Sequence, residues 1–389
     1  MNGPLLVINS GSSSLKFGVY AHRDGHEAVL FKGVVRHIGG ERGTLSLQDA
    51  HGQKVFEKSA PYPTQREAFD RAMDRLESLG HTPPVAIGHR VVHGGPHLRE
   101  HRALTDEVLH TLEATTHFAP LHVPPALELI HHARERYPSV PQFACFDTVF
   151  HRTLPEEAAV FPVPREYRDQ GVERYGFHGL SYESIVERLK PRVPERTIVA
   201  HLGSGASLAA LRHGLSVDTT MGFTPTGGIP MGTRTGDIDP GVLLWLLRQG
   251  HMDAEGLESL VNHDSGLKAL SGGTSDMSEL TRAAGFGDAP AALALSVFVR
   301  SIAKTIGAYA TVLGGVDLLV FTGGIGENSP IVRQRVCAML GPLGLVLDDG
   351  RNRDGQGVIS APGSRGTIQI LPSEEEEQIA RHTRRLMRT

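Results

Sequence analysis

The sequence predicts an α/β protein of two duplicated domains, each a mixed sheet flanked by helices, with a cleft between them. Three observations carry this prediction. At 389 residues the chain is longer than one hydrophobic core usually serves. Apolar runs with strand spacing alternate with runs of helical spacing. One strand-turn-strand layout also occurs twice, as "LLVINSGSSSLKFGV" at 5–19 and as "TIVAHLGSGASLAAL" at 197–211.

The composition is that of a soluble globular protein. Hydrophobic residues make up 40% and charged residues 21%, and the net charge of −4 argues against a nucleic-acid partner. Cys145 and Cys337 are too few for a disulfide framework, and no signal-peptide pattern opens the chain, so a cytoplasmic location is expected. The most apolar stretch, 289–313, contains Arg300 and Lys304 and predicts a buried helix instead of a membrane span.

The first half alternates strand and helix patterns. Short apolar or alternating runs predict strands at 5–8, 15–20, 28–35, 54–57, 85–95 and 142–147. The stretch "TQREAFDRAMDRLESLG" at 64–80 has apolar residues at helical spacing and ends on Gly80, which predicts an amphipathic helix. Two further helices are expected near 107–118 and 125–137.

The second half opens with the repeated hairpin and ends on a helix. The stretch "DLLVFTGGIGENSPIVRQRV" at 317–336 predicts a buried strand, a glycine-rich turn, and a helix with Ser329 as its N-cap and Pro330 at its first position. The final stretch, 371–389, has acids first and bases last, which suits the macrodipole of a helix.

Polar residues suited to anions gather in glycine-punctuated stretches after the apolar runs. They include two arginines, three histidines and two aspartates: Arg90, Arg234, His122, His178, His201, Asp147 and Asp237. Arginine binds carboxylate or phosphate with a bidentate fork, glycine lets backbone amides approach, and a carboxylate can hold magnesium. This set is typical of phosphoryl transfer. No Walker sequence occurs, so "TGGIGEN" at 322–328 is the candidate nucleotide turn.

The hairpin turn at 9–14 is open to two interpretations. Its serines could merely satisfy local backbone groups. A turn lined by hydroxyls and amides beside Lys16 could equally bind a phosphate.

An ordered set of motifs resembles the acetate kinase family. The motifs are "INSGSSSLKF", "GHRVVHGG", "FDTVFH", "RYGFHG", "MGFTP" with "MGTRTGDIDPG", "FTGGIGENS" and "EEEEQIA", spread from residue 5 to about 380. The resemblance implies two actin/ribonuclease-H-like domains around an active-site cleft: 1–149, completed by a helix at 376–389, and a nucleotide-binding and dimerisation domain at 150–375. It also implies reversible phosphoryl transfer from ATP to acetate with Mg²⁺, or Mn²⁺ in its place, by a homodimer with no membrane partner.

The resemblance also implies roles for single residues. Arg90 and Arg234 match the arginines that hold the carboxylate and the transferring phosphoryl group, and His178 matches a donor to that group, with His122 and His201 in support. Asn9, Asp147 and Glu375 match the residues associated with the metal. The small apolar substrate pocket matches Val92, Leu121, Phe177 and Pro225, beside Arg90. The nucleotide residues match Asn9, Ser12, Ser14, Lys16, His201, Gly203, Gly205, Gly323, Gly324, Ile325, Gly326 and Asn328.

Elementary chemistry agrees with this assignment. A carboxylate is already ionised at pH 7, so as a nucleophile it needs no general base. The barrier is the approach of two anions, which cationic and hydrogen-bonding groups lower. An alternative for Arg90 is that it pairs with a carboxylate and holds the two domains in register.

Several positions depart from the family pattern. Val123 and Ser204 stand where the family usually has asparagine, "HGLSY" replaces "HGTSH", and "TGGIPMGTR" replaces "LEGLMMGTR". These changes lie beside the predicted site, so propionate is an alternative substrate.

Two other classes of function are weighed against a kinase. The pair of histidines in "HRVVH" at 89–93 could indicate a metal hydrolase, but that motif needs a helix and a glutamate, whereas valines predict a strand here. A non-catalytic nucleotide-binding relative is the second alternative, against which the retained Arg90, Asp147, His178, Arg234 and Glu375 argue.

Overall fold

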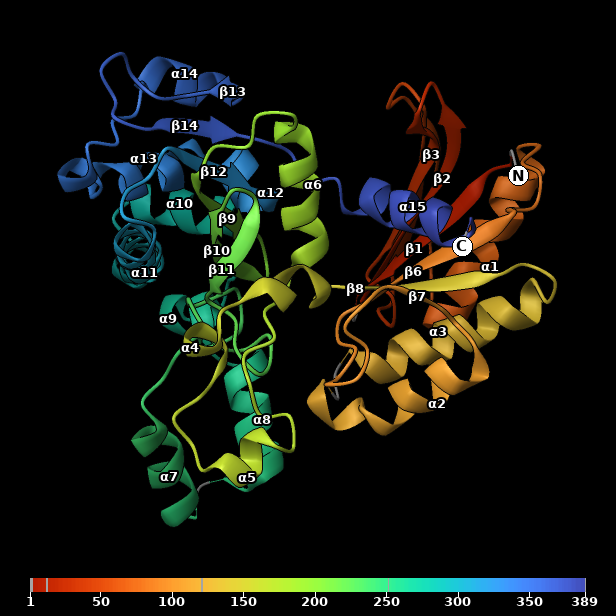
Figure 1. The fold of residues 1–389 in the computed structure, drawn as a ribbon, viewed down its shortest axis with the longest axis horizontal. Helices are drawn as coiled ribbons and strands as arrows, with labels where there is room; N and C mark the ends of the chain where they lie inside the picture. Colours follow the sequence, from red (N-terminus) through yellow and green to blue (C-terminus); the bar gives the residue numbers. More distant parts are fainter. Residues whose placement is uncertain (1–2, 12, 120–121, 251, 389) are drawn as a thin grey trace. The chain divides into compact units, whose positions relative to one another are not determined.

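The chain folds into two compact units, seen in a computed structural model that describes residues 3–11, 13–119, 122–250 and 252–388 (Figure 1). Unit 1 comprises Met1–Val149, Gly179–Ser184 and Glu374–Thr389, and unit 2 comprises Phe150–His178 and Ile185–Ser373. The predicted domain limits, 1–149 with 376–389 and 150–375, stay a prediction.

Unit 1 is built on a sheet in the order β5-β4-β3-β2-β1-β6-β8-β7. The strands are β1 (Leu5–Ser10), β2 (Ser14–Arg23), β3 (His26–Arg36), β4 (Gly43–Asp49), β5 (Lys54–Ala60), β6 (Ala86–Val91), β7 (Arg102–Ala103) and β8 (Gln142–Phe146). Strands β1 to β5 form an antiparallel meander, whereas β6 and β8 run parallel to β1. The carboxyl ends of β1, β6 and β8 therefore lie side by side.

Helices cover both faces of this sheet. They are α1 (Gln65–Ser78), α2 (Asp106–Ala114), η1 (Thr116–Phe118), α3 (Val123–Arg136) and α15 (Glu375–Leu386). Phe69 of α1 and Leu129 of α3 pack in one core with β1 to β4, and Ile379 of α15 packs in another with Leu5 and Val7. The predicted helix at 64–80 is confirmed: Thr64 caps α1 by accepting from the backbone N–H of Glu67, and Gly80 follows its end with φ of +84°.

Unit 2 is built on a smaller sheet in the order β11-β10-β9-β12-β14-β13. Its strands are β9 (Arg196–Leu202), β10 (Ala206–Arg212), β11 (Leu215–Thr219), β12 (Leu318–Thr322), β13 (Gly357–Val358) and β14 (Thr367–Ile370). Its helices are η2 (Val149–Thr153), α4 (Glu156–Ala159), α5 (Arg165–Arg168), α6 (Gly179–Leu189), α7 (Pro240–Arg248), α8 (Ala254–His263), α9 (Gly266–Ser271), α10 (Met277–Gly285), α11 (Ala289–Leu313), α12 (Gly323–Asn328), α13 (Pro330–Ala338), η3 (Gly341–Leu343) and α14 (Asp349–Asp354), of which η2 and α6 are shared with unit 1.

The predicted duplication is confirmed by the two sheets. The strands β3-β2-β1-β6-β8 of unit 1 and β11-β10-β9-β12-β14 of unit 2 have the same order and the same directions. In each opening hairpin a backbone N–H bonds back across the turn, from Gly11 to the carbonyl oxygen of Ser14 at 2.8 Å and from Gly203 to that of Gly205 at 3.1 Å.

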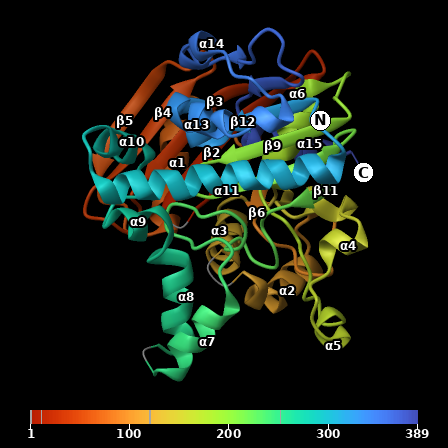
Figure 2. The same ribbon diagram turned by 90° about the vertical axis from the view of Figure 1, so that its left-hand side faces the viewer.

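The long helix α11 lies along the sheet of unit 2 (Figure 2). Among the described residues it is the one helix that is long and apolar enough to cross a membrane. The core helix of a soluble protein can be equally long and apolar, and 44% of the apolar window of α11 is buried inside the protein. Ala294, Phe298 and Ile302 are fully buried, as the prediction of a buried helix requires. The two cysteines are buried and free.

Two local predictions were wrong or incomplete. Strand β4 was not predicted, although Leu45 and Leu47 alternate with polar residues and are buried. The glycine-rich stretch after β12 is a short helix, α12, instead of a turn. Gly323 reverses the chain at φ of +77°, and the Glu327 carboxylate accepts from the N–H of Gly323 at 2.9 Å, so a helical turn forms despite the glycines. The predicted cap of the next helix is confirmed, since the Ser329 hydroxyl accepts from the N–H of Val332.

Replacing Gly88 by alanine should weaken the packing of α15 on β6. A Cβ at Gly88 would lie 2.2 Å from Thr383 Oγ1 and 2.7 Å from Ile379 Cγ2. We expect Gly88→Ala to lower the free energy of unfolding by ~1–3 kcal/mol, measured by urea titration, because overpacked cores lose that much. Gly307→Ala in α11, where nothing lies within 4 Å, is the control and should be neutral or stabilising. Equal stability of the two variants would contradict this packing.

Candidate functional site

Three predicted residues of unit 1 meet at the ends of its parallel strands. Arg90 lies on β6, Asp147 directly follows β8, and Asn9 lies on β1. Arg90 Nε donates to Asp147 Oδ1 at 3.0 Å, and Nη2 donates to Oδ2 at 2.5 Å. The remaining arm, Nη1, donates to Asn9 Oδ1 at 3.1 Å. One guanidinium therefore connects the ends of three neighbouring strands.

The start of α15 adds carboxylates to this cluster. Asn9 Nδ2 donates to Glu376 Oε1 at 3.1 Å and lies 3.4 Å from Glu375 Oε2. Glu375 Oε2 is also 3.9 Å from Arg90 Nε. The cluster thus combines one cation with carboxylate and amide oxygens, the donor chemistry that Mg²⁺ prefers.

Burial makes the pairing of Arg90 and Asp147 strong. The side chain of Asp147 is 1% exposed and that of Arg90 is 18% exposed. Burial alone lowers the pKa of Arg90, but the carboxylates of Asp147 and Glu375 overcome this and raise it. Burial raises the pKa of Asp147, while Arg90 beside it opposes that rise. Both residues belong to unit 1.

In unit 2, His178 is held in a strained backbone conformation. It precedes α6 with φ of 57° and ψ of 24°, a left-handed region that costs a non-glycine residue roughly 1–3 kcal/mol. Its Nδ1 lies 2.9 Å from the hydroxyl oxygen of Ser207. Its ring stacks on that of His201, with centroids 4.3 Å apart. The backbone, Ser207 and His201 together fix the direction of the His178 ring.

His178 and Arg234 converge on one glycine. A Cβ built on Gly205 would lie 3.3 Å from His178 Nε2 and 3.6 Å from Arg234 Nη1. That same Nη1 donates to the carbonyl oxygen of Pro225 at 3.1 Å. The absence of a side chain at Gly205 leaves room beside two nitrogen donors, an arrangement suited to a phosphoryl oxygen.

The two glycine-rich stretches of unit 2 approach each other. A Cβ on Gly203 would lie 3.9 Å from the backbone nitrogen of Gly324 and 3.9 Å from His201 Nε2. A Cβ on Gly323 would clash with the carbonyl oxygen of Leu202 at 2.7 Å. The structure therefore brings together the hairpin turn 203–205 and the start of α12, which also contains the predicted Ile325, Gly326 and Asn328.

The other predicted residues are placed as follows. Ser14 and Lys16 lie on β2, and Lys16 pairs with Asn9 in register and is exposed. Val92 follows β6, and His122 precedes α3, both in unit 1, whereas Phe177 and Pro225 are in unit 2. Ser12 and Leu121 lie outside the described residues.

The metal-hydrolase alternative is contradicted by β6. His89 lies in this strand and not on a helix. Its Nε2 donates to Gln142 Oε1 at 2.7 Å, and burial lowers the pKa of His89 to about 4. His93 Nδ1 instead accepts from the N–H of Gly95 at 2.7 Å.

A second polar cluster of unit 1 escaped the sequence analysis. Ligand atoms of His101, Glu183 and His382 lie within 4.8 Å of one another, the donor set of many zinc sites. However, the N–H of Phe146 donates to His101 Nδ1 at 3.0 Å, and Arg385 Nη2 donates to His382 Nδ1 at 3.3 Å. A neutral ring that accepts at Nδ1 carries its hydrogen on Nε2, which disfavours Nε2 as a metal ligand. His382 Nε2 donates to Glu183 Oε2 at 2.5 Å, whereas His101 Nε2 lies 3.8 Å from Glu183 Oε1. The cluster stabilises the packing of α15 and α6.

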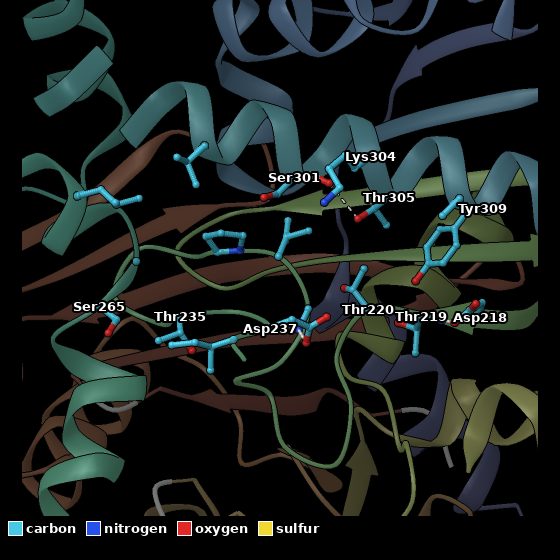
Figure 3. Close-up of a pocket in the computed structure, with 18 of the residues that line it drawn as sticks. Asp218, Thr219, Thr220, Thr235, Asp237, Ser265, Ser301, Lys304, Thr305 and Tyr309 are labelled. Carbon is cyan, nitrogen blue, oxygen red and sulfur yellow. Dashed lines mark hydrogen bonds between the residues drawn. The ribbon is translucent and has the colours of Figure 1, made fainter. Parts of the chain in front are cut away.

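A pocket of about 740 Å³ lies between α11 and the segment 228–238 of unit 2 (Figure 3). Ser301, Lys304 and Tyr309 of α11 face it from one side, and Thr235 and Asp237 lie along the other. Of the residues predicted to handle anions, Asp237 lines it, whereas Arg90, His178 and Arg234 do not.

Comparison with known proteins gives a consistent result. The model of the acetokinase family matches residues 4–381. An acetate kinase of Methylocella silvestris is 43% identical over 402 residues, covering 100% of this chain and 98% of that protein.

Solved structures agree along the whole chain. The crystal structure of Porphyromonas gingivalis acetate kinase matches with a TM-score of 0.86 and 36% identity, covering 99% of this chain and 100% of that one. The crystal structure of a propionate kinase from Francisella tularensis subsp. tularensis matches with a TM-score of 0.92 and 33% identity, with the same coverage.

Removing Arg90 should destabilise the fold. Arg90→Ala would leave the Asp147 carboxylate, only 1% exposed, without its cation. We expect a loss of ~3–5 kcal/mol in the free energy of unfolding, the cost of breaking one partner of a buried ion pair. Arg90→Lys should lose less, because it keeps the charge but not the fork. Urea titration of both variants tests this. An Arg90→Ala variant as stable as the wild type would mean that the pair contributes nothing to folding.

Proposed function

This chain belongs to the acetokinase family, and we propose that it catalyses the reversible transfer of a phosphoryl group from ATP to acetate, giving acetyl phosphate and ADP. Family membership supports the reaction class and the use of ATP and ADP. The single observation that carries the mechanism is the convergence of His178 and Arg234 on Gly205.

In the proposed reaction the acetate carboxylate attacks the γ-phosphorus directly and in line. Acetate is ionised at neutral pH, so no residue needs to remove a proton. The transition state is loose and spreads negative charge over the three equatorial oxygens of the transferring group. Catalysis then depends on donors already aimed at that charge.

Unit 2 supplies such donors. His178 Nε2 and Arg234 Nη1 lie on the same side of Gly205, and Ser207 and His201 hold the histidine ring in place. Because these groups are fixed before the substrate arrives, little reorganisation is needed when the charge develops. We assign His178 and Arg234 to the transferring phosphoryl group and His201 and His122 to support of the phosphates.

In this proposal, residues of unit 1 bind the substrate carboxylate and the metal. Arg90 is assigned to the substrate carboxylate and the transferring group. Val92 and Leu121, together with Phe177 and Pro225 of unit 2, are assigned to the apolar end of the acid. Asn9, Asp147 and Glu375 would hold Mg²⁺, and their oxygen donors beside Arg90 fit a hard cation. When bound, the ion supplies neutralisation of phosphate charge.

The nucleotide is assigned to the hairpin turns and α12. Gly203, Gly205, Gly323 and Gly324 leave backbone accessible where the hairpin turn 203–205 approaches the start of α12. Ser12, Ser14 and Lys16 are assigned to the phosphates from the hairpin of unit 1. Free buried cysteines accord with a cytoplasmic enzyme, which is part of this proposal.

Propionate is the second candidate substrate. A propionate kinase shares the fold at a TM-score of 0.92, and Val123, Ser204 and "TGGIPMGTR" depart from the usual family pattern. One extra methylene changes binding in an apolar pocket by only about 1–3 kcal/mol, so the two acids are best separated by measurement.

The purified chain should form acyl phosphate from ATP, Mg²⁺ and a short carboxylate. We expect a higher kcat/KM with acetate than with propionate, no turnover without an acid, and loss of turnover in excess EDTA that added Mg²⁺ restores. Hydroxamate trapping of the acyl phosphate gives the measurement. A higher kcat/KM with propionate would reassign the substrate, and ATP hydrolysis that ignores the acid would refute the proposal.

Arg234→Ala should lower kcat by ~10³ or more, the scale for loss of a cationic contact to a transferring phosphoryl group. His178→Ala should lower kcat by ~10² to 10³, as for one lost donor to a developing charge. Arg353→Ala, an exposed arginine of unit 2, is the control. Steady-state kinetics on variants with native thermal unfolding tests this. If the variants kept the wild-type kcat and only their KM for acetate rose, Arg234 and His178 would be substrate-binding groups and would not stabilise the transition state.

We also propose that the chain is a homodimer that pairs through α7. This helix, "PGVLLWLLR", has no buried residue. Its exposed apolar residues are Val242, Leu244, Trp245 and Leu247, with exposed fractions of 42%, 48%, 55% and 43%, an apolar surface too rich to remain in water. Because this surface is apolar and not charged, a second copy of α7 or its surroundings is the expected cover.

A charge on this face should separate the subunits. Trp245→Asp is expected to convert a dimer into a monomer, because an unpaired carboxylate in an apolar interface costs several kcal/mol. Sedimentation equilibrium measures the mass, and Gln249→Asp at the exposed end of the same helix is the charge-matched control. A wild-type monomer, or a variant dimer of unchanged affinity, would exclude pairing through α7.

A further inference from the structure

We propose that Arg333 is a positioning residue for the nucleotide, which holds α12 in its binding conformation together with Asn352. This inference rests on the proposed function, because it deepens the assignment of α12 to the nucleotide. Neither residue was singled out by the sequence patterns.

Arg333 contacts the last turn of α12 directly. It lies on α13, and its Nη1 donates to the carbonyl oxygens of Gly326 at 2.8 Å and Glu327 at 2.9 Å. The final carbonyl groups of a helix have no partner within the helix, so the guanidinium satisfies two of them. It therefore fixes where α12 ends.

Asn352 fixes the guanidinium in turn. Arg333 Nε donates to Asn352 Oδ1 at 2.8 Å, and Nη2 donates to the backbone oxygen of Asn352 at 2.8 Å. The amide of Asn352 then donates to the carbonyl oxygen of Pro330 at 2.9 Å, at the start of α13. Three segments, α12, α13 and α14, are thereby tied to one planar group.

The charge on Arg333 has an unusual environment. Arg333 is 1% exposed, and its partners are all neutral: in the described part of the chain no carboxylate pairs with it. Burial lowers the pKa of Arg333 to about 10, which keeps it protonated at pH 7. Burying an unpaired charge is costly, so packing alone would favour an apolar residue here. A positive charge behind α12 favours an anionic ligand on its other side, as a nucleoside phosphate would be.

The opposite end of α12 is held independently. Glu327 Oε1 accepts from the N–H groups of Gly323 at 2.9 Å and Ser373 at 3.1 Å. A helix of six residues held at both ends has little freedom. Loosening the Arg333 end is therefore expected to move the surface offered to the nucleotide.

The test compares Arg333→Lys and Asn352→Ala with the wild type and with Arg335→Lys, an exposed arginine on the same helix. The lysine keeps the charge and loses the fork, and the alanine leaves Arg333 its bonds to α12. We expect ADP affinity by calorimetry to fall ~10-fold or more in Arg333→Lys, and KM for ATP to rise in parallel, the scale of effect that a displaced binding segment has. The ADP affinity of Asn352→Ala should also fall. In the double variant the loss of binding free energy should be smaller than the sum of the two single losses, because the two residues act through one contact. The KM for acetate should change by less than ~2-fold in every variant.

The protection of α12 from hydrogen exchange by ADP separates a positioning role of Arg333 from a purely structural one, because a purely structural role would not change that protection. ADP should slow exchange across 323–328 in the wild type and in Arg335→Lys, and much less in Arg333→Lys. Should Arg333→Lys fail to fold, Asn352→Ala decides the question by the same measurements. Wild-type ADP affinity and protection in folded variants, even with lowered thermal stability, would overturn the inference. Failure of the wild type to phosphorylate any carboxylate would refute the proposed function alone, since ADP binding is measured without turnover.

Discussion

The guanidinium of Arg90 connects the carboxyl ends of three adjacent parallel strands, and the candidate site of unit 1 depends on it. Asp147 after β8 and Asn9 on β1 both bond to it, and Asn9 extends the network to the acids of α15. Asp147 is almost wholly buried, so its charge needs this partner. The same bonds that stabilise the strand ends thus orient the oxygens assigned to the metal. In the proposed function, folding and metal binding are therefore coupled at this point, and a variant of Arg90 or Asp147 is expected to alter both.

Unit 2 uses the duplicated hairpin differently. His201 occupies the place of Asn9, two residues before the turn, and pairs with Ser207 as Asn9 pairs with Lys16. In unit 1 this pair carries an amide and a cation, whereas in unit 2 the ring of His201 and the hydroxyl of Ser207 support His178. Glycine at 205 then keeps the space beside His178 and Arg234 clear. The same backbone frame thus presents an amide and neighbouring carboxylates in unit 1 and two imidazole rings in unit 2, the groups that the proposed function assigns to the metal and to the phosphates.

Much of the fold could be predicted from local patterns, because hydrophobic periodicity and capping residues act over short distances. The duplicated hairpin, α1 with Thr64 and Gly80, and the cap at Ser329 are examples. The sequence did not show that α12 is helical, since its glycines favour a turn and the stabilising contacts come from Glu327 and Arg333. Nor did it show that Arg90 and Asp147 bond to each other, because that pairing depends on β6 and β8 being neighbours. Arg333 and the cluster around Glu183 were missed for a related reason: no spacing reveals that a charged side chain is buried.

The central claim is that His178 and Arg234 bind the transferring phosphoryl group more tightly in the transition state than in the ground state. The most direct measurement compares the affinity of ADP alone with that of ADP, Mg²⁺, acetate and aluminium fluoride together, a planar mimic of the transferring group. It is made in the wild type and in Arg234→Ala. The account predicts that the variant binds ADP almost as well as the wild type but loses most of its affinity for the mimic, as transition-state analogues report differential binding. Equal losses in both affinities would contradict it and would make Arg234 a ground-state binding residue.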